Sequence, residues 1–147
     1  MRTNLIITFL IILVFFASCA KENEIIEIRE RMFATHINDI FLNAEEYLGK
    51  TVRLEGIFRT GLTNNGDQLF YVFRFAPDDC CASNGMIGFE VRGQKSILTP
   101  GNIPENDSWV EVTGVLSEAV YGRRKYLYIE LTSLIELDIR GAEFVER

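Results

Sequence analysis

Two adjacent cysteines, Cys80 and Cys81, carry the most reactive side chains of this chain, and two carboxylates, Asp78 and Asp79, come directly before them. Thiolates with carboxylates beside them are ligands for a thiophilic metal ion such as zinc or copper. Neighbouring Cα atoms lie roughly 3.8 Å apart across a trans peptide, below the usual disulfide range, so a bond between the two sulfurs would be strained. The segment is therefore open to a metal site, two free thiols or a strained vicinal disulfide.

The rest of the chain limits what these cysteines can form. The C-x-x-C spacing of thioredoxin-like proteins is absent, and the only other cysteine and the only histidine are Cys19 and His36. If Cys19 carries a lipid, as argued below, a closed four-ligand zinc site cannot form, and a metal would occupy an open or transferring site. A histidine without a partner is more often structural than a ligand. The alternative to metal binding for the two thiols is also structural: they would be small, half-buried residues beside an acidic turn.

A second group of residues could bind a ligand or partner without catalysis. Arg74, Trp109, Tyr126 and Tyr128, together with Tyr121, are the aromatic and basic side chains that would line such a face. Packing on the outside of a barrel is the alternative role for the aromatic residues. No nucleophile motif and no glycine-rich phosphate loop is present. The sequence therefore predicts a binding protein and not an enzyme.

Five predicted strands position these residues. Each segment is rich in β-branched and aromatic residues, and the first alternates apolar with charged side chains; the segments are Thr51–Arg59, Gln68–Phe75, Met86–Arg92, Trp109–Leu116 and Lys125–Leu137. Hairpin turns are indicated at residues 63–67 and 121–124, and the longest connection, residues 94–106, separates the third strand from the fourth. This pattern predicts an all-β protein with a five-stranded OB-fold-like Greek-key barrel.

Helix is expected only before these strands. Apolar residues recur every three or four positions from Ile25 to Phe41, which favours an amphipathic helix or a helix leading into an extended piece. Residues 43–49 combine an N-cap residue, a glutamate three positions later and a final glycine, which indicates one short helical turn. Within the strands, Gly56 and Gly114 mark the sharp bends that a small barrel needs.

The N-terminus has the features of an export signal. Arg2 precedes an apolar run, Leu5–Phe16, that is interrupted only by Thr8, and small residues follow it. This run is short of the ~20 residues that span a bilayer, which disfavours a retained membrane helix. The residues from Phe16 to Cys19 resemble the lipobox of bacterial lipoproteins. The resemblance implies cleavage before Cys19, a diacylglycerol on its sulfur and a location outside the cytoplasm, in the periplasm or at the cell surface.

The remaining chain suits one domain. We expect a signal peptide at residues 1–18, a lipidated spacer at 19–24 and a single barrel domain at 25–147. The signal contains one of the 15 basic residues and none of the 21 acidic ones, so the mature net charge is 14 − 21 = −7. This charge opposes nucleic-acid binding, which relies on cationic neutralisation of phosphates.

A family resemblance covers residues 43–137. Its elements are the string from Tyr47 to Val52 followed by Gly56, the pair Arg74-Phe75 shortly before Cys80-Cys81-Ala82, and Trp109-Val110 with Gly114. This pattern resembles the C-terminal soluble domain of the YcgQ-like bacterial membrane proteins, which are encoded beside predicted permeases. In that family, alanine- and aspartate-rich residues typically follow Cys-Cys-Ala, whereas residues 83–85 here are Ser-Asn-Gly.

The resemblance implies a domain that assists a permease at the membrane surface. The expected function is thus a lipid-anchored, extracytoplasmic and non-catalytic binding module. Its expected partners are a permease or another envelope protein, without nucleic acid. The alternative is a metal-handling lipoprotein that binds zinc or copper through Cys80 and Cys81.

The anchor can be tested at Cys19. Cys19→Ser should abolish membrane association and leave the domain folded, because permanent attachment requires the acyl chains that the cysteine thiol initiates. Membrane fractionation of cells that express either chain measures the effect. Recovery of the serine variant in membranes with its leader uncut would instead identify Leu5–Phe16 as a transmembrane anchor.

Overall fold

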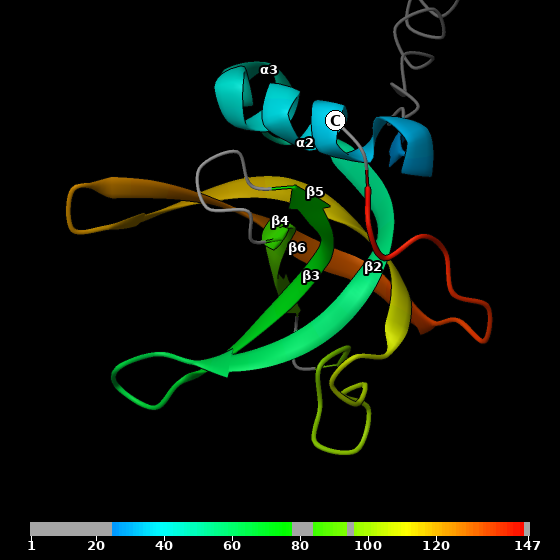
Figure 1. Ribbon diagram of the computed structural model, residues 1–147. Helices are drawn as coiled ribbons and strands as arrows, with labels where there is room; N and C mark the ends of the chain where they lie inside the picture. Colours follow the sequence, from blue (N-terminus) through cyan, green and yellow to red (C-terminus); the bar gives the residue numbers. More distant parts are fainter. Residues whose placement is uncertain (1–24, 78–83, 94–95, 146–147) are drawn as a thin grey trace, which may run out of the picture.

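The computed structural model describes residues 25–77, 84–93 and 96–145 (Figure 1). Six strands and three short helical segments make up this part of the chain. In order they are β1 (Ile25–Ile28), the 3-10 helix η1 (Glu30–Met32), α2 (Phe33–Leu42), α3 (Ala44–Tyr47), β2 (Thr51–Leu62), β3 (Gln68–Pro77), β4 (Asn84–Gly93), β5 (Trp109–Tyr121) and β6 (Arg124–Glu136). No helix among the described residues is long and apolar enough to cross a membrane.

The strands close into a barrel. β2 pairs antiparallel with both β3 and β5, β3 pairs with β4, β5 pairs with β6, and a short parallel pairing of β4 with β6 completes the ring. Counted from β2, β4 and β6 are the third and fifth of the five barrel strands, and the other pairings among these five are antiparallel. This arrangement is typical of an OB-fold-like Greek-key barrel. This confirms the predicted fold, with each of the five predicted strands at its expected place.

The prediction was wrong at the start of the domain. Ile25–Ile28 forms strand β1, which runs parallel to β2 with Ile25 beside Thr51, and helix α2 begins only at Phe33. Three of the four residues of β1 are isoleucines, which favour extended backbone. Their spacing also fits one face of a helix, so periodicity alone could not separate the two structures. The short helical turn expected at residues 43–49 is confirmed as α3.

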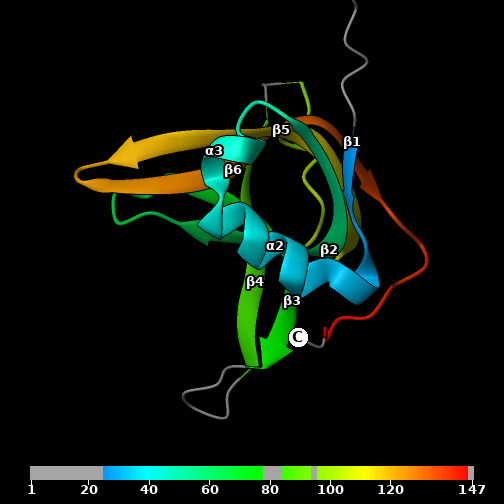
Figure 2. The ribbon, with the colours of Figure 1, turned by 90° about the horizontal axis from the view of Figure 1, so that it is seen from above.

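Helix α2 covers one end of the barrel. It buries Phe33, Ala34, Ile37 and Ile40 against the barrel interior, and Figure 2 shows both α2 and α3 lying over that end. The interior itself consists of alternate apolar side chains from every strand of the ring: Val52, Leu54, Phe58, Val72, Phe89, Val91, Val110, Val112, Leu116, Ile129 and Leu131. The helix therefore completes the same hydrophobic core that the strands enclose.

Close backbone approaches explain the two strand glycines. A Cβ atom at Gly56 would lie 2.7 Å from the carbonyl oxygen of Phe73, and one at Gly114 would lie 2.3 Å from that of Glu130. The register of β5 and β6 also shifts between Thr113 and Gly114, which marks a bulge that bends the strand. The glycines thus let neighbouring strands pass closely where the barrel wall bends.

Arg74 is a buried cation that joins the helix to the barrel. Its guanidinium carbon lies 4.7 Å from the ring centre of Phe33 on α2 and 4.8 Å from that of Trp109 on β5. Its Nε donates a hydrogen bond to the carbonyl oxygen of Glu55 at 2.9 Å, and its Nη1 donates to that of Ala142 at 3.1 Å. Only 2% of Arg74 is exposed. The side chain therefore connects α2, β2, β5 and the C-terminal segment.

This arrangement changes the interpretation of two predicted ligand-face residues. Trp109 is also 2% exposed, and its indole Nε1 donates to the Glu55 carboxylate at 3.2 Å. A Cβ atom at Gly141 would lie 2.9 Å from the Trp109 ring, so the C-terminal segment packs directly against it. Arg74 and Trp109 are buried within the domain. They therefore do not form the exposed face with Tyr126 and Tyr128 that the sequence predicted.

The bend at Gly114 can be tested by a single methyl group. Gly114→Ala should lower the free energy of unfolding by about 2–4 kcal/mol, because a backbone carbonyl cannot move aside as a side chain can. Gly61→Ala is the matched control, since its Cβ would meet only the ring of Tyr71, at 3.2 Å. Chemical denaturation of both variants measures the difference. Equal stability of the two would contradict the bent-strand interpretation.

The role of Arg74 can be tested against an exposed arginine. Arg74→Ala should destabilise the domain by about 2–4 kcal/mol, because it removes two cation–π contacts and leaves buried carbonyl oxygens without donors. Arg59 is the control, because it also lies over a ring, that of Phe73, but pairs with Asp107 at the surface. Arg59→Ala should cost about 0–1 kcal/mol. Denaturant midpoints that fall equally would show that Arg74 is not the central contact.

Candidate functional site

The residues predicted from the sequence are distributed over three places. Tyr126 and Tyr128 lie on β6, whereas Arg74 and Trp109 are buried under α2 and the C-terminal segment. Cys19 and the cluster of Asp78, Asp79, Cys80 and Cys81 lie outside the described residues. The strands on either side of the cluster pair as far as Pro77 and Asn84, so residues 78–83 connect β3 to β4.

No metal site is evident in the part of the chain that the structure describes. No group of three histidine, cysteine or acidic side chains comes close enough to hold an ion there. His36 lies on α2, where its Nδ1 is buried and has no hydrogen-bond partner among the described residues. The metal hypothesis thus rests on the sequence around Cys80 and Cys81 alone.

Sheet register gathers four tyrosines and one ion pair on the wall formed by β3, β4 and β6. Glu90 of β4 lies beside Tyr71 of β3 on one side and Tyr128 of β6 on the other. Arg92 follows two residues later on the same face of β4, because side chains alternate along a strand. Tyr121 and Tyr126 are added from the β5–β6 hairpin. We refer to this group as the tyrosine–arginine face: Tyr71, Glu90, Arg92, Tyr121, Tyr126 and Tyr128.

Arg92 is the centre of this face. Its guanidinium carbon lies 4.0 Å from the ring centre of Tyr128 and 5.8 Å from that of Tyr121. Its Nε donates to the Glu90 carboxylate at 2.6 Å, and its Nη2 donates to the Tyr121 hydroxyl at 3.4 Å. The rings of Tyr121 and Tyr126 meet edge to face at 5.8 Å. Arg92 is therefore held between two strands of the barrel wall and the tip of the hairpin.

The electrostatics of the face favour a charged Arg92. Burial acts to lower the pKa of Arg92, but the hydrogen bond and charge of Glu90, with Tyr121 and Tyr128 nearby, outweigh it and raise the pKa above its ordinary value. Burial and the charge of Glu90 raise the pKa of the Tyr71 hydroxyl. The face thus presents a charged guanidinium, paired with Glu90, beside tyrosine rings.

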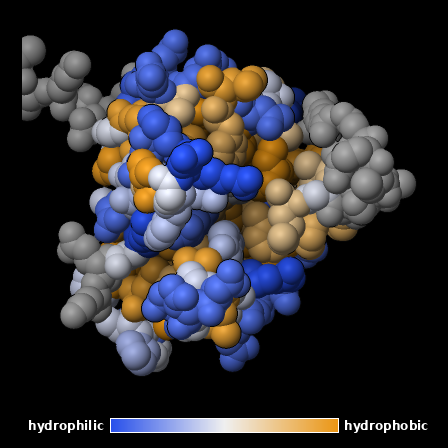
Figure 3. Space-filling model, turned by 90° about the vertical axis from the view of Figure 1, so that its left-hand side faces the viewer, coloured by the Kyte–Doolittle hydropathy of each residue, from blue (hydrophilic) through white to orange (hydrophobic). Residues whose placement is uncertain are grey.

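A cleft of about 740 Å³ opens beside Arg92. The turn between β2 and β3 forms one rim of the cleft, and Tyr121, beside the β5–β6 turn, contributes to the other rim. Both turns project to the same side of the barrel in Figures 1 and 2. Figure 3 shows this side, with hydrophilic residues on the projecting turns and hydrophobic residues between them. The lining residues are Thr63, Asn64, Asn65, Asp67, Gln68, Leu69, Phe70, Glu90, Val91, Arg92, Gly93, Leu98 and Tyr121.

The cleft has the composition of a binding site. Its lining combines apolar side chains, including Leu69, Phe70 and Leu98, with amide, carboxylate and guanidinium groups. This mixture can fix the orientation of a bound molecule. Sequence reasoning identified Tyr121, Tyr126 and Tyr128 but missed Tyr71, Glu90 and Arg92. The alternation of Glu90 and Arg92 with buried Phe89 and Val91 marked them as outward-facing, but only the long-range pairing of β4 with β6 brings them to the tyrosines.

Comparison with solved structures gives a distant likeness. The N-terminal domain of the PriB protein from Thermoanaerobacter tencongensis, solved as a dimeric structure, aligns with a TM-score of 0.36 and 18% sequence identity. The alignment covers 60% of this chain and 97% of that domain. No curated protein matches the sequence.

A family comparison covers much more of the chain. The family model matches residues 16–140 of 147, a range that contains every strand of the barrel. The protein therefore belongs to the DUF1980 C-terminal domain family.

Proposed function

We propose that this protein is a non-catalytic binding module, anchored by lipid on Cys19 outside the cytoplasm, that binds an envelope protein through the tyrosine–arginine face. The observation that carries the proposal is Arg92, held between Tyr121 and Tyr128 at the edge of the cleft. A permease is the partner that the family resemblance implies. The proposed location is the periplasm or the cell surface.

The composition of the face supports a protein partner. Tyrosine and arginine are enriched among the residues that dominate the binding energy of protein interfaces, and a tyrosine ring offers a large contact area with little loss of conformational entropy. Contacts with Glu90, Tyr121 and Tyr128 already restrain Arg92. Binding would therefore cost less side-chain ordering than a free surface arginine would require.

The position of the face within the fold supports its use in binding. OB-folds bind their ligands on the wall of the second and third barrel strands, between the first hairpin loop and the loop before the last strand. Here those elements are β3, β4, the turn at residues 63–67 and the β5–β6 turn, which together surround the cleft. The net charge, −6 for the whole chain and −7 after the proposed cleavage, and the ion pair of Arg92 with Glu90 both disfavour a nucleic-acid ligand.

The proposed anchor would keep the barrel near the membrane. Cys19 precedes the first residue of β1, Ile25, by six positions, and an extended chain spans at most ~3.3–3.6 Å per residue. Six residues therefore reach about 20 Å. A barrel tethered this closely meets partners that are themselves embedded in, or attached to, the same membrane.

The proposal can be tested by site-specific photocrosslinking of the full chain in its own cells. A photoreactive residue at Tyr121 should form an adduct with one envelope protein. The same residue at Val120 should form far less, although the two positions are similarly exposed, 60% and 62%. They point to opposite sides of β5. Adducts are measured by gel shift and mass spectrometry.

A second substitution links the adduct to the face. Arg92→Ala should reduce the Tyr121 adduct at least about tenfold, because loss of a central interface residue costs ~1.4 kcal/mol or more. Arg92→Lys should recover little of it, since an ammonium lacks the planar stack. Thermal melting confirms that both variants fold. Equal adducts at Val120 and Tyr121, or an adduct insensitive to Arg92, would refute the proposed binding face.

A further inference from the structure

One stretch of β4 has a strand on only one of its sides. β3 pairs with β4 from Phe70 beside Val91 to Pro77 beside Asn84, whereas β6 pairs only with Glu90–Gly93. The part from Gly85 to Phe89 therefore has no second strand neighbour among the described residues. Alternate backbone N–H and C=O groups along this edge point away from β3 and can pair with another strand.

The opposite edge of the same ribbon is already completed. Phe144, near the C-terminus, bridges to Phe75 of β3 in parallel. The amide of Phe75 donates to the carbonyl oxygen of Glu143 at 2.7 Å, and the amide of Val145 donates to that of Phe75 at 2.8 Å. Their rings stack with centres 5.3 Å apart. A short extended segment thus stabilises β3 where β4 has no counterpart.

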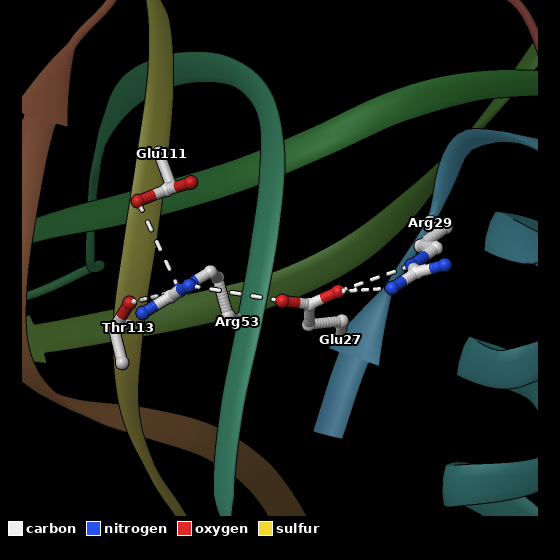
Figure 4. Close-up of polar contacts among 5 residues, drawn as sticks. All are labelled: Glu27, Arg29, Arg53, Glu111 and Thr113. Carbon is white, nitrogen blue, oxygen red and sulfur yellow. Dashed lines mark hydrogen bonds and ion pairs between the residues drawn. The ribbon is translucent and has the colours of Figure 1, made fainter. Parts of the chain in front are cut away.

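The edge at β1 shows how this chain protects a strand from pairing. β1 has only four residues, and its Glu27 accepts a hydrogen bond from Arg29 at 2.7 Å and lies 3.8 Å from Arg53 of β2 (Figure 4). Arg53 continues the network to Glu111 and Thr113 of β5. Short length and charged side chains are devices that prevent edge-to-edge association.

The edge of β4 lacks these protections. Its residues are Gly85-Met86-Ile87-Gly88-Phe89, with no charge and no proline. Met86 is 65% exposed, and the adjacent end of α2 exposes Phe41, which stacks on Phe89 with ring centres 5.3 Å apart. An uncharged, apolar edge of this kind favours pairing with another strand.

The sequence of the edge is complementary to itself. In an antiparallel pair of two such strands centred on Ile87, each Met86 falls opposite the other copy's Gly88, and each Phe89 falls opposite the other copy's Gly85. Directly opposed residues project to the same side of a sheet. Met86 and Phe89 would therefore each face a glycine, and Ile87 would face its counterpart on the other copy. The pairing ends at Phe89, because β6 already pairs with β4 from Glu90 onward. This register brings no like charges together.

We propose that two copies of this chain associate through antiparallel pairing of their β4 edges, centred on Ile87. The contact is isologous, so it closes at two chains and does not propagate into a fibre. It uses residues outside the tyrosine–arginine face and does not depend on the proposed function. Pairing would join the two β3–β4 ribbons into one continuous sheet and cover Met86.

Disulfide trapping of the full chain in the cell envelope tests this contact. Ile87→Cys is introduced with Cys80→Ser and Cys81→Ser, which leaves Cys19 for the lipid. Opposed Cα atoms in an antiparallel pair lie ~4.5–5.5 Å apart, within the disulfide range of ~4.4–6.8 Å. Mild oxidation should convert most of the mature chain to a band of twice its mass that reductant reverses. Glu27→Cys on β1, in the same background, is the matched control and should form little dimer.

A further variant separates specific pairing from random collision. Met86→Lys should reduce the Ile87→Cys band at least about tenfold. The change adds one lysine from each copy to the contact, opposite Gly88, and charged side chains on an edge strand oppose pairing. Met86 is exposed, so this change spares the core; thermal melting checks that both variants fold. A band no stronger than that of Glu27→Cys would overturn the proposal, and so would a band that persists with Met86→Lys.

Discussion

Arg74 is the one buried charged side chain among the described residues, and its contacts link the elements around the barrel. Arg74 lies between the rings of Phe33 and Trp109, with its N–H groups directed to main-chain carbonyls of Glu55 and Ala142. Burial lowers the pKa of this guanidinium, and the nearby carboxylates of Glu30 and Glu55 oppose that effect. An arginine remains charged in such surroundings, so the fold must keep its aromatic and carbonyl partners in place. Helix α2, the start of β5 and the C-terminal segment each supply one of these partners.

The domain's own chain covers other parts of the barrel. Helix α2 covers one end, and the C-terminal segment packs on Trp109 over the outer cluster of Ile57 and Phe73. On the wall of β3, β4 and β6, the ion pair of Arg92 with Glu90 stays near the surface, within reach of solvent. The two arginines are thus used differently: Arg74 is enclosed by its own chain, and Arg92 is restrained but open to a partner.

Sequence reasoning succeeded where the pattern was local. Strand alternation, the turn at residues 63–67 and the glycines at 56 and 114 each depend on a few neighbouring residues, and the structure confirms all of them. It failed for Arg74 because β3 has apolar residues on both faces, so alternation could not show which face is enclosed. It failed for β1 because four residues with three isoleucines fit helix and strand equally. Arg92 required the pairing of strands that lie far apart in the sequence, which no local signal encodes.

The parallel pairing of β4 with β6 is the short seam that closes the barrel. It spans only Glu90–Gly93, whereas β5 and β6 pair along nearly their whole length through a tight hairpin. Pairing two strands that are distant in the sequence costs more loop-closure entropy than forming a hairpin. We therefore expect the seam to form late in folding, and its amides to exchange hydrogen sooner than those of the hairpins. Arg92 and Tyr128 lie on opposite sides of this seam. A molecule that binds across them would hold the barrel closed, and its affinity would then appear as slower exchange at the seam.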